Sequence, residues 1–408
     1  MFFIFAQLAI LRGIKMGASN KTAGLLKYNI KKCFKRNGFN ILRYIFNATE
    51  RISGQESTFF IELATVNPYI NPHEVVLGFK PRVNISPEDL HNMLAGSVAA
   101  KNLQSEELVL PSYMAVRAGV LGGVVPKSLC DYESVKNVSM SQRSFDVRTE
   151  CCHFTDDTLE GQIVCSKNSI NEHPEFLCDS GTMQWNLRYK KDLAFSHGFK
   201  DKMNVWSCPG ARTTFAGTVV FDGKEYVVSA KKSFGYIEHI WQKTGLADWF
   251  HISSSNLTSI FTGKLMQNSV FAVHGEYNKR LSVLTFFEGR YNEFAADSSK
   301  RSYKTIYECT QTPNGEDEKE QLHWSVSVNS KTYVLDIDVF CPANQMYVRS
   351  LELPEGKRQL IKLLCGIAGS GEIRLYKKIH KSLELIEQAH IATALCEFGK
   401  IENDQSTC

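Results

Sequence analysis

The sequence predicts an all-β protein built from antiparallel barrels or sandwiches, and three observations support this. Strand-like segments recur from residue 50 onward without the regular alternation of strand and helix that marks a doubly wound sheet. Apolar and polar residues alternate in them with a period of two, as in strands that bury one face. Hydrophobic residues make up 43% and charged residues 22% of the chain, which is enough apolar material for sizeable cores.

Two hairpins are the clearest elements. Asp222-Gly223 separates the strand-like segments 215–221 and 224–230, and this dipeptide favours a tight turn because both positions tolerate positive φ. A second hairpin is expected over 322–340, where apolar residues alternate with polar ones before a turn near Ser330. Further strands are expected at 58–66, 112–118, 184–189, 269–274 and 281–287, and helical character at 86–107.

The length of 408 residues predicts two domains preceded by a basic arm. We place the arm at 1–37, the first domain at 38–240 and the second at 241–408. Residues 1–49 contain nine Lys or Arg and no acid, whereas the whole chain has 47 basic and 43 acidic residues. The body is therefore mildly acidic, and we expect no nucleic-acid partner for it.

The N-terminal arm has two parts with different implications. The apolar run 2–11 is too short to cross a bilayer core of roughly 30 Å, and it lacks the preceding basic residues of a signal peptide. We expect a cytoplasmic protein, and secretion or organelle targeting by this run stays open. Residues 25–36 combine basic and apolar residues at helical spacing, which predicts either peripheral contact with an anionic membrane or a solvated lead-in to the first domain.

Metal and nucleotide sites are not indicated. The 12 cysteines include no C-x-x-C pair, and the 11 histidines include no H-E-x-x-H. Gly366 to Gly371 resembles a phosphate loop, but the strand-like segment 372–376 follows it, so we interpret it as a bulge or tight turn. We therefore expect no metal and no cofactor.

One segment, 234–241, contains several side chains that could take part in catalysis or binding. A carboxylate and an imidazole stand next to each other between aromatic residues. The segment is either a strand end whose charged pair faces water, or part of an apolar pocket in which burial raises the pKa of the acid. In the second case the acid stays protonated and donates at neutral pH, and aromatic faces stabilise a carbocation. The residues concerned are Tyr236, Glu238, His239 and Trp241, with Trp206 and Trp249 on either side in the sequence.

Several segments resemble the tocopherol cyclase family. They include the run from Trp206 to Gly217, which contains Arg212, and then 221–226, Gly235-Tyr236 and 254–258. Segments 40–47, 59–62, 111–119 and 174–185 are also similar to members of that family. The resemblance extends from about residue 28 to about residue 401. It implies two lipocalin-like β-barrels side by side with a short helical N-terminal arm, and an apolar substrate held near their junction.

The chain also departs from the family. The family pattern Gly-Tyr-x-Asp-Lys-Asn-Trp-Gly corresponds to Gly235-Tyr-Ile-Glu-His-Ile-Trp-Gln242, so Ile240 and Gln242 remove part of the polar network around the acid. The resemblance implies an isomerase that closes a ring on a prenylated, quinol-type substrate without a cofactor. Its alternative is a non-catalytic lipid or isoprenoid carrier. In the enzyme, Glu238 and His239 are the catalytic residues, and Trp206, Arg212, Tyr236, Trp241 and Trp249 bind the substrate.

Overall fold

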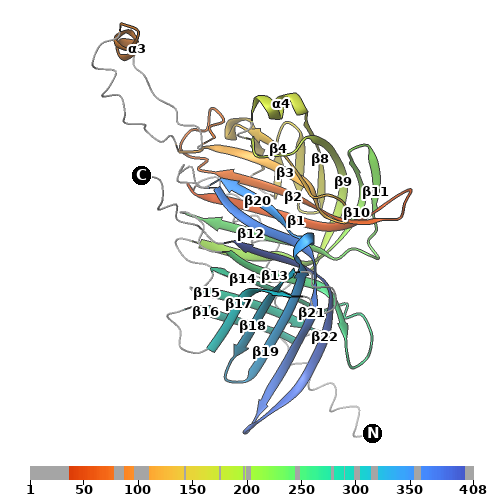
Figure 1. Cartoon of the computed structure of the whole chain (residues 1–408). Coiled ribbons are helices and arrows are strands. Elements are labelled where there is room, and N and C mark those ends of the chain that lie inside the picture. Colours follow the sequence, from red (N-terminus) through yellow and green to blue (C-terminus); the bar gives the residue numbers. More distant parts are fainter. Residues whose placement is uncertain are drawn as a thin grey trace.

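The fold is all-β, as the sequence predicts. Two antiparallel sheets contain β1 to β22, and the described residues form only two α-helices, α3 (Pro87–Leu94) and α4 (Lys167–Glu172), with 3-10 turns at Val135–Asn137 and Ala343–Gln345. Helix α3 stands apart from both sheets (Figure 1). The computed structural model describes residues 36–77, 87–95, 110–141, 144–173, 176–195, 198, 204–243, 249–276, 280–288, 290–297, 304–313, 320–352 and 360–399.

The first sheet has the strand order β4-β3-β2-β1-β11-β10-β9-β8-β7-β6-β5, and β12 pairs with both β1 and β10. It curls into a barrel-like shape, since β8 returns to β4, where the Cys165 thiol lies 3.5 Å from the Cys130 carbonyl oxygen. Its strands are β1 (Phe39–Glu50), β2 (Glu56–Val66), β3 (Tyr113–Gly122), β4 (Lys127–Glu133), β5 (Ser139–Met140), β6 (Asp146–Arg148), β7 (Cys152–Thr155), β8 (Thr158–Cys165), β9 (Gly181–Phe195), β10 (Asn204–Phe221), β11 (Lys224–Val228) and β12 (Gly235–Gln242).

The second sheet has the order β16-β15-β14-β13-β22-β21-β19-β18-β17, with β20 paired to the start of β21. The chain passes from the first sheet to the second between Gln242 and Trp249. The strands are β13 (Trp249–Ser259), β14 (Val270–Glu276), β15 (Arg280–Phe287), β16 (Arg290–Asp297), β17 (Lys304–Pro313), β18 (Glu320–Asn329), β19 (Tyr333–Pro342), β20 (Tyr347–Glu352), β21 (Leu360–Ile379) and β22 (Ser382–Gly399).

The local sequence signals produce the expected local structures. Strands β10 and β11 meet at Asp222 and Gly223, whose φ angles of 47° and 79° are those of a tight hairpin turn. Strands β18 and β19 pair around Ser330. The glycine-rich segment lies inside β21, where the pairing with β22 shifts register between Gly366 and Gly371. That segment is therefore a bulged strand.

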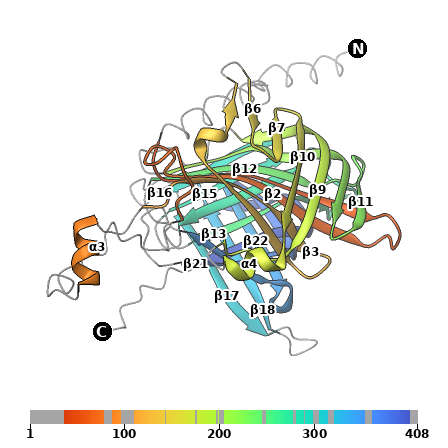
Figure 2. The same cartoon turned by 90° about the horizontal axis from the view of Figure 1, so that it is seen from above.

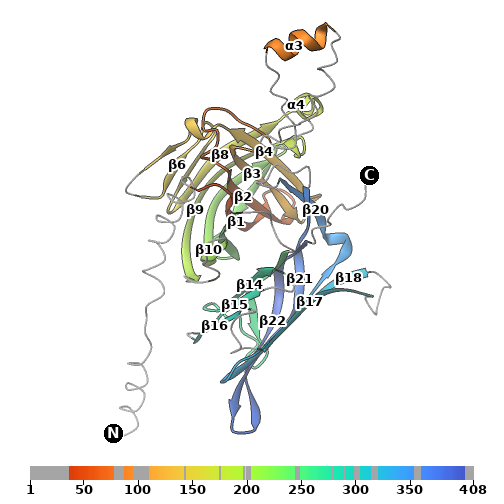
Figure 3. The ribbon, with the colours of Figure 1, turned by 90° about the vertical axis from the view of Figure 1, so that its left-hand side faces the viewer.

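The two sheets pack against each other, one above the other in Figures 1 and 3. Figure 2, from above, shows their strands overlapping. Each sheet encloses its own core, and a third cluster of buried residues fills the junction between them. Strand β1 consequently buries both faces: Leu42, Tyr44 and Phe46 face the first core, and Ile41 and Ile45 face the junction. The expectation of one buried face per strand fails at the junction and holds on outer strands such as β9.

The basic arm lies almost entirely outside the described residues. Of the proposed arm 1–37, the structure describes only residues 36 and 37. The proposed membrane contact over 25–36 therefore lies outside the described residues except for Arg36. Arg36 packs against the first sheet, with its guanidinium carbon 5.2 Å from the centre of the Trp241 ring.

Candidate functional site

A row of buried charges crosses the junction face of the first sheet. Arg43 on β1 pairs in register with Glu238 on β12 and with Glu62 on β2, and Glu62 pairs with Arg117 on β3. Arg43 points to the junction because it shares its strand face with Ile41 and Ile45. All four side chains are buried. The sign alternates from strand to strand, which is the favourable arrangement for directly opposed side chains.

Arg43 links the two sheets. Its Nε donates to Oε1 of Glu238 at 2.9 Å, and its Nη2 donates to Oε2 of Glu397 on β22 at 2.9 Å. Further short contacts join the same guanidinium to both carboxylates. One cation therefore serves two acids from different sheets, and each bond is charge-assisted. Removing one member of such a buried cluster leaves an uncompensated charge.

Aromatic side chains complete the shell around these acids. Trp206 Nε1 donates to Oε2 of Glu238 at 2.9 Å, and Trp249 Nε1 donates to Oε2 of Glu397 at 3.0 Å. The Tyr236 hydroxyl donates to Oε2 of Glu238 at 3.2 Å. The structure thus brings together Trp206, Tyr236, Glu238 and Trp249. Both indoles act as hydrogen-bond donors to carboxylates, and neither ring is among the residues that line the cavity described below.

The protonation state expected for Glu238 is corrected. Burial by itself raises the pKa of this carboxyl, but Arg43, two histidines and the Trp206 N–H outweigh burial and hold the pKa well below its usual range. The pKa of Glu397 is lowered by the same arginine against the effect of burial. Glu238 is consequently ionised at neutral pH. The expectation of a raised pKa is wrong because an arginine from the neighbouring strand faces the acid where an open apolar pocket was expected.

His239 and Trp241 lie on the other face of β12. Side chains alternate along a strand, so both point to the side of Ile237 and away from Glu238. His239 Nε2 lies 2.6 Å from Oδ1 of Asn40, and burial lowers the pKa of His239 to about 4 although the Glu238 charge raises it. The two residues do not share the site with Glu238.

Arg212 is also separate from the charge row. It lies in β10 where the pairing with β9 shifts register. Its Nη1 donates to the carbonyl oxygens of Ser255 at 3.3 Å and Met266 at 3.4 Å. Arg212 therefore ties the first sheet to β13 and the loop that follows it, and it is not among the lining residues of the cavity described next.

A cavity of about 290 Å³ opens at the junction between β3, β4 and β20. Its inner wall includes Arg117 and Arg349, which are buried, while Leu177 and Val348, 37% and 57% exposed, lie where it meets solvent. Glu238 is not among its lining residues. These are Arg117, Pro126, Lys127, Ser128, Leu177, Cys178, Asp179, Tyr347, Val348 and Arg349.

The two arginines of the cavity differ in their partners. Arg349 Nη1 donates to Oε1 of Glu62 at 2.7 Å, and a second contact joins Nη2 to Oε2, so this pair is bidentate. Arg117 is only 6% exposed, yet its Nη1 has no hydrogen-bond partner among the described residues. The hydroxyl of Tyr347 is likewise buried without one. Two buried donors of the cavity wall are therefore unsatisfied by the described protein.

The sequence contains a signal for the residues of the charge row that is not part of any motif. Arg43, Glu62, Arg117 and Glu397 are each the single charge inside an apolar strand segment. A charge on a strand that is apolar on both faces must be buried and compensated. Pairing such lone charges across predicted strands identifies candidates for the row, although it does not identify the partners.

No group of three or more His, Cys, Asp or Glu side chains among the described residues is arranged to hold a metal ion. In the same part of the chain, neither helix has the length and hydrophobicity needed to cross a membrane.

Comparisons with known proteins give only distant structural similarity. No protein-family model matches the chain, and no curated protein matches it. Among solved structures, the chain is similar to kievitone hydratase from Nectria haematococca, with 9% identity, 90% of this chain and 91% of that chain covered, and a TM-score of 0.43. It is also similar to a protein assigned as AttH from Nitrosomonas europaea, with 9% identity, 88% and 92% covered, and a TM-score of 0.42.

Proposed function

We propose that this protein binds a small organic molecule in the cavity between β3, β4 and β20, without acid catalysis at Glu238. The observation that carries the proposal is the closure of the Glu238 site. The carboxylate accepts hydrogen bonds from Arg43, Trp206 and Tyr236 and is fully buried. It has no proton to give at neutral pH and does not border the cavity. Of the two functions suggested by the sequence, the non-catalytic carrier fits this geometry better.

The cavity has the features of a binding site. Its volume of about 290 Å³ is close to the lower end of the roughly 300–1,000 Å³ typical of small-molecule sites. It has a buried polar wall and an exposed apolar rim. The interior of the first barrel is less suitable, because large side chains such as Tyr44, Phe59 and Phe215 fill the core. The proposed ligand therefore lies between the sheets.

Occupancy of the cavity is tested by native mass spectrometry of protein purified from its own host. We expect a bound small molecule in the wild type and its loss in Val348→Trp, which places an indole at the mouth. Ile306→Trp is the matched control, since Ile306 is a similarly exposed apolar residue of the second sheet at 59% and does not line the cavity. Absence of any ligand in the wild type, or equal occupancy in both variants, would contradict the proposal.

The tocopherol cyclase-like activity is the second candidate, because Trp206, Tyr236 and Glu238 do converge. It is tested by incubating the protein with a prenylated quinol and searching for a ring-closed product of unchanged mass and altered retention. We expect no such product. Product formation by the wild type that is lost in Glu238→Gln would overturn the non-catalytic assignment.

A further inference from the structure

We propose that the ligand of the junction cavity is an organic anion, anchored by Arg117 and the hydroxyl of Tyr347. The inference rests on the proposed function and adds the chemical class of the ligand. Arg117 extends from the centre of β3 and is buried in the wall of the cavity. No described carboxylate forms an ion pair with it, and the ring of Tyr132, 6.0 Å away, is its aromatic neighbour.

The other cations of the lining already have partners. Arg349 is held by both oxygens of Glu62. Lys127 Nζ lies 2.6 Å from Oδ2 of Asp222, and its side chain is one-third exposed. Arg117 is therefore the one lining cation, within the described part of the chain, that is buried without a carboxylate in ion-pair contact. Its cross-strand neighbour Glu62 is already bound by Arg349 and lies 3.9 Å from Arg43. Negative charge is therefore scarce at this wall, which favours a ligand that supplies it.

Tyr347 provides a second donor. Its hydroxyl is buried and has no hydrogen-bond partner among the described residues. Burial raises the pKa of Tyr347 well above its usual value, which keeps the hydroxyl protonated and able to donate. A carboxylate, with two acceptor oxygens, satisfies a guanidinium N–H and a phenolic O–H together.

The remaining lining indicates a monoanion with an apolar body. Pro126, Leu177 and Val348 border the cavity, which far exceeds the volume of an inorganic anion. Asp179 is also in the lining, and its carboxylate disfavours a second negative charge on the ligand. A carboxylic acid whose head reaches Arg117 and whose apolar part extends toward Leu177 and Val348 fits these features.

The test is equilibrium binding to the full chain by calorimetry. The probes are benzoate, naphthoate, octanoate and palmitate, each compared with its corresponding alcohol, and sulfate as an inorganic anion. We expect at least one carboxylate to bind at least tenfold more tightly than its alcohol. The aromatic and short-chain acids distinguish a soluble metabolite from a membrane-derived fatty acid as the source of the carboxylate.

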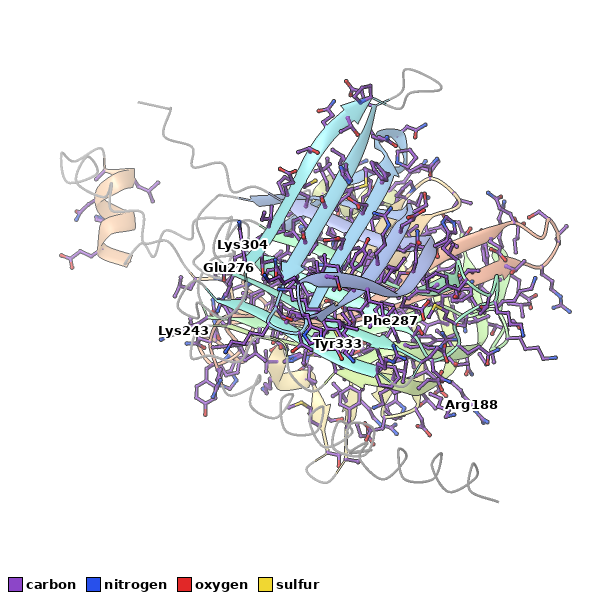
Figure 4. All side chains as sticks on the ribbon, turned by 90° about the horizontal axis from the view of Figure 1, so that it is seen from below. Arg188, Lys243, Glu276, Phe287, Lys304 and Tyr333 are labelled. Carbon is purple, nitrogen blue, oxygen red and sulfur yellow. The ribbon has the colours of Figure 1, made fainter. Side chains whose placement is uncertain are left out.

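The variants assign the binding to the two donors. We expect Arg117→Gln to weaken carboxylate binding at least tenfold and Tyr347→Phe to weaken it several-fold. Arg117→Lys keeps the charge and should retain part of the affinity. Arg188→Gln is the control, because Arg188 is an exposed arginine of β9 that lies at the outer edge of the molecule in Figure 4.

The possible outcomes separate the two proposals. If alcohols bind as tightly as acids, or Arg117→Gln and Arg188→Gln behave alike, the anion site is overturned and cavity binding survives. If sulfate alone binds, the organic class is wrong. If no probe binds and native mass spectrometry finds no ligand, the proposed function itself fails. A purely structural Arg117 would lower the unfolding midpoint when replaced, whereas we expect Arg117→Gln to unfold at or above the wild-type midpoint.

Discussion

Arg43 and Arg117 lie on the same row of cross-strand neighbours, at similar burial, and have opposite surroundings. Arg43 bonds to Glu238 and Glu397, and each of these carboxylates also accepts an indole N–H, from Trp206 and Trp249 respectively. Arg117 faces a cavity with an unsatisfied Nη1. The same side chain on the same face of one sheet thus binds two carboxylates in one place, whereas in the other its nearest carboxylate, Glu62, is already paired with Arg349. The comparison teaches that burial of a charge alone does not distinguish a structural residue from a binding residue, whereas the identity of its partners does.

The difference originates in the second sheet. Strand β22 brings Glu397 against Arg43, so that end of the row gains an acid. Strand β20 brings Arg349 against Glu62, so the acid opposite Arg117 is already engaged. The two strands contribute opposite charges to the junction, and the Arg117 end is left with an excess of positive charge. Four predictions test this contrast.

The largest expected effect is that of Arg43→Met. It leaves two buried carboxylates without their cation, and we expect a loss of about 3–5 kcal/mol in the free energy of unfolding. Urea unfolding measures the loss, with Arg51→Met as control, because Arg51 forms an exposed pair with Glu225 whose contribution is within about 1 kcal/mol. A loss as small as that of the control would contradict the structural role of Arg43.

The pH dependence of stability should reflect two buried histidines together with the acids at the Arg43 end of the row. Burial lowers the pKa values of His239 and His274 to about 4 and about 3. Below about pH 6.5 these histidines are therefore protonated in the unfolded chain while they are still neutral in the folded protein. As the pH falls, each of these histidines therefore lowers the free energy of unfolding by about 1.4 kcal/mol per pH unit. For His239 this loss occurs between about pH 6.5 and about pH 4.

The depressed pKa values of Glu238 and Glu397 add to this. Their contribution is complete above the unfolded value of about 4.3 and is lost as the pH falls toward the folded values. Urea unfolding at several pH values measures the slope, and His239→Asn should reduce it between about pH 4 and about pH 6.5. An unchanged slope in that variant would mean that the pKa of His239 is the same in the folded and unfolded protein.

A smaller effect is expected for Trp249→Phe, which removes the N–H donor to Glu397 and keeps most of the ring. We expect a loss of about 1–3 kcal/mol beyond that of the control Trp185→Phe. Trp185 is equally buried, but its indole N–H has no partner among the described residues, so its replacement changes packing alone. Equal losses in the two variants would show that the Trp249 hydrogen bond does not stabilise the junction.

The smallest effect, with the opposite sign to that of Arg43→Met, is expected for Arg117→Met without ligand. Arg117 has no described carboxylate in ion-pair contact, so its removal should leave the free energy of unfolding unchanged or raise it by up to about 2 kcal/mol. The measurement is urea unfolding of ligand-free protein beside Arg43→Met. A loss as large as that of Arg43→Met would place Arg117 in the structural cluster.

Much of the fold could be predicted from the sequence because its signals are local. The Asp222-Gly223 turn, the alternating strands of the 322–340 hairpin and the glycine bulge of β21 each depend on residues adjacent in the chain. The aromatic and acidic grouping of Trp206, Tyr236, Glu238 and Trp249 was also recognisable. The separation of His239 and Trp241 from Glu238 follows from strand alternation once β12 is known to bury both faces.

The sequence by itself determined the strands, their turns and the presence of lone charges on apolar segments, because these depend on backbone preferences and on the nearest neighbours along the chain. Only the tertiary structure decided what the charges do. Glu238 lies 195 residues from Arg43, and Arg43 lies 354 residues from Glu397, yet their contacts set the ionised state of the acid. The pKa of a buried group depends on charges within a few ångströms, and strand register together with sheet packing fixes those charges.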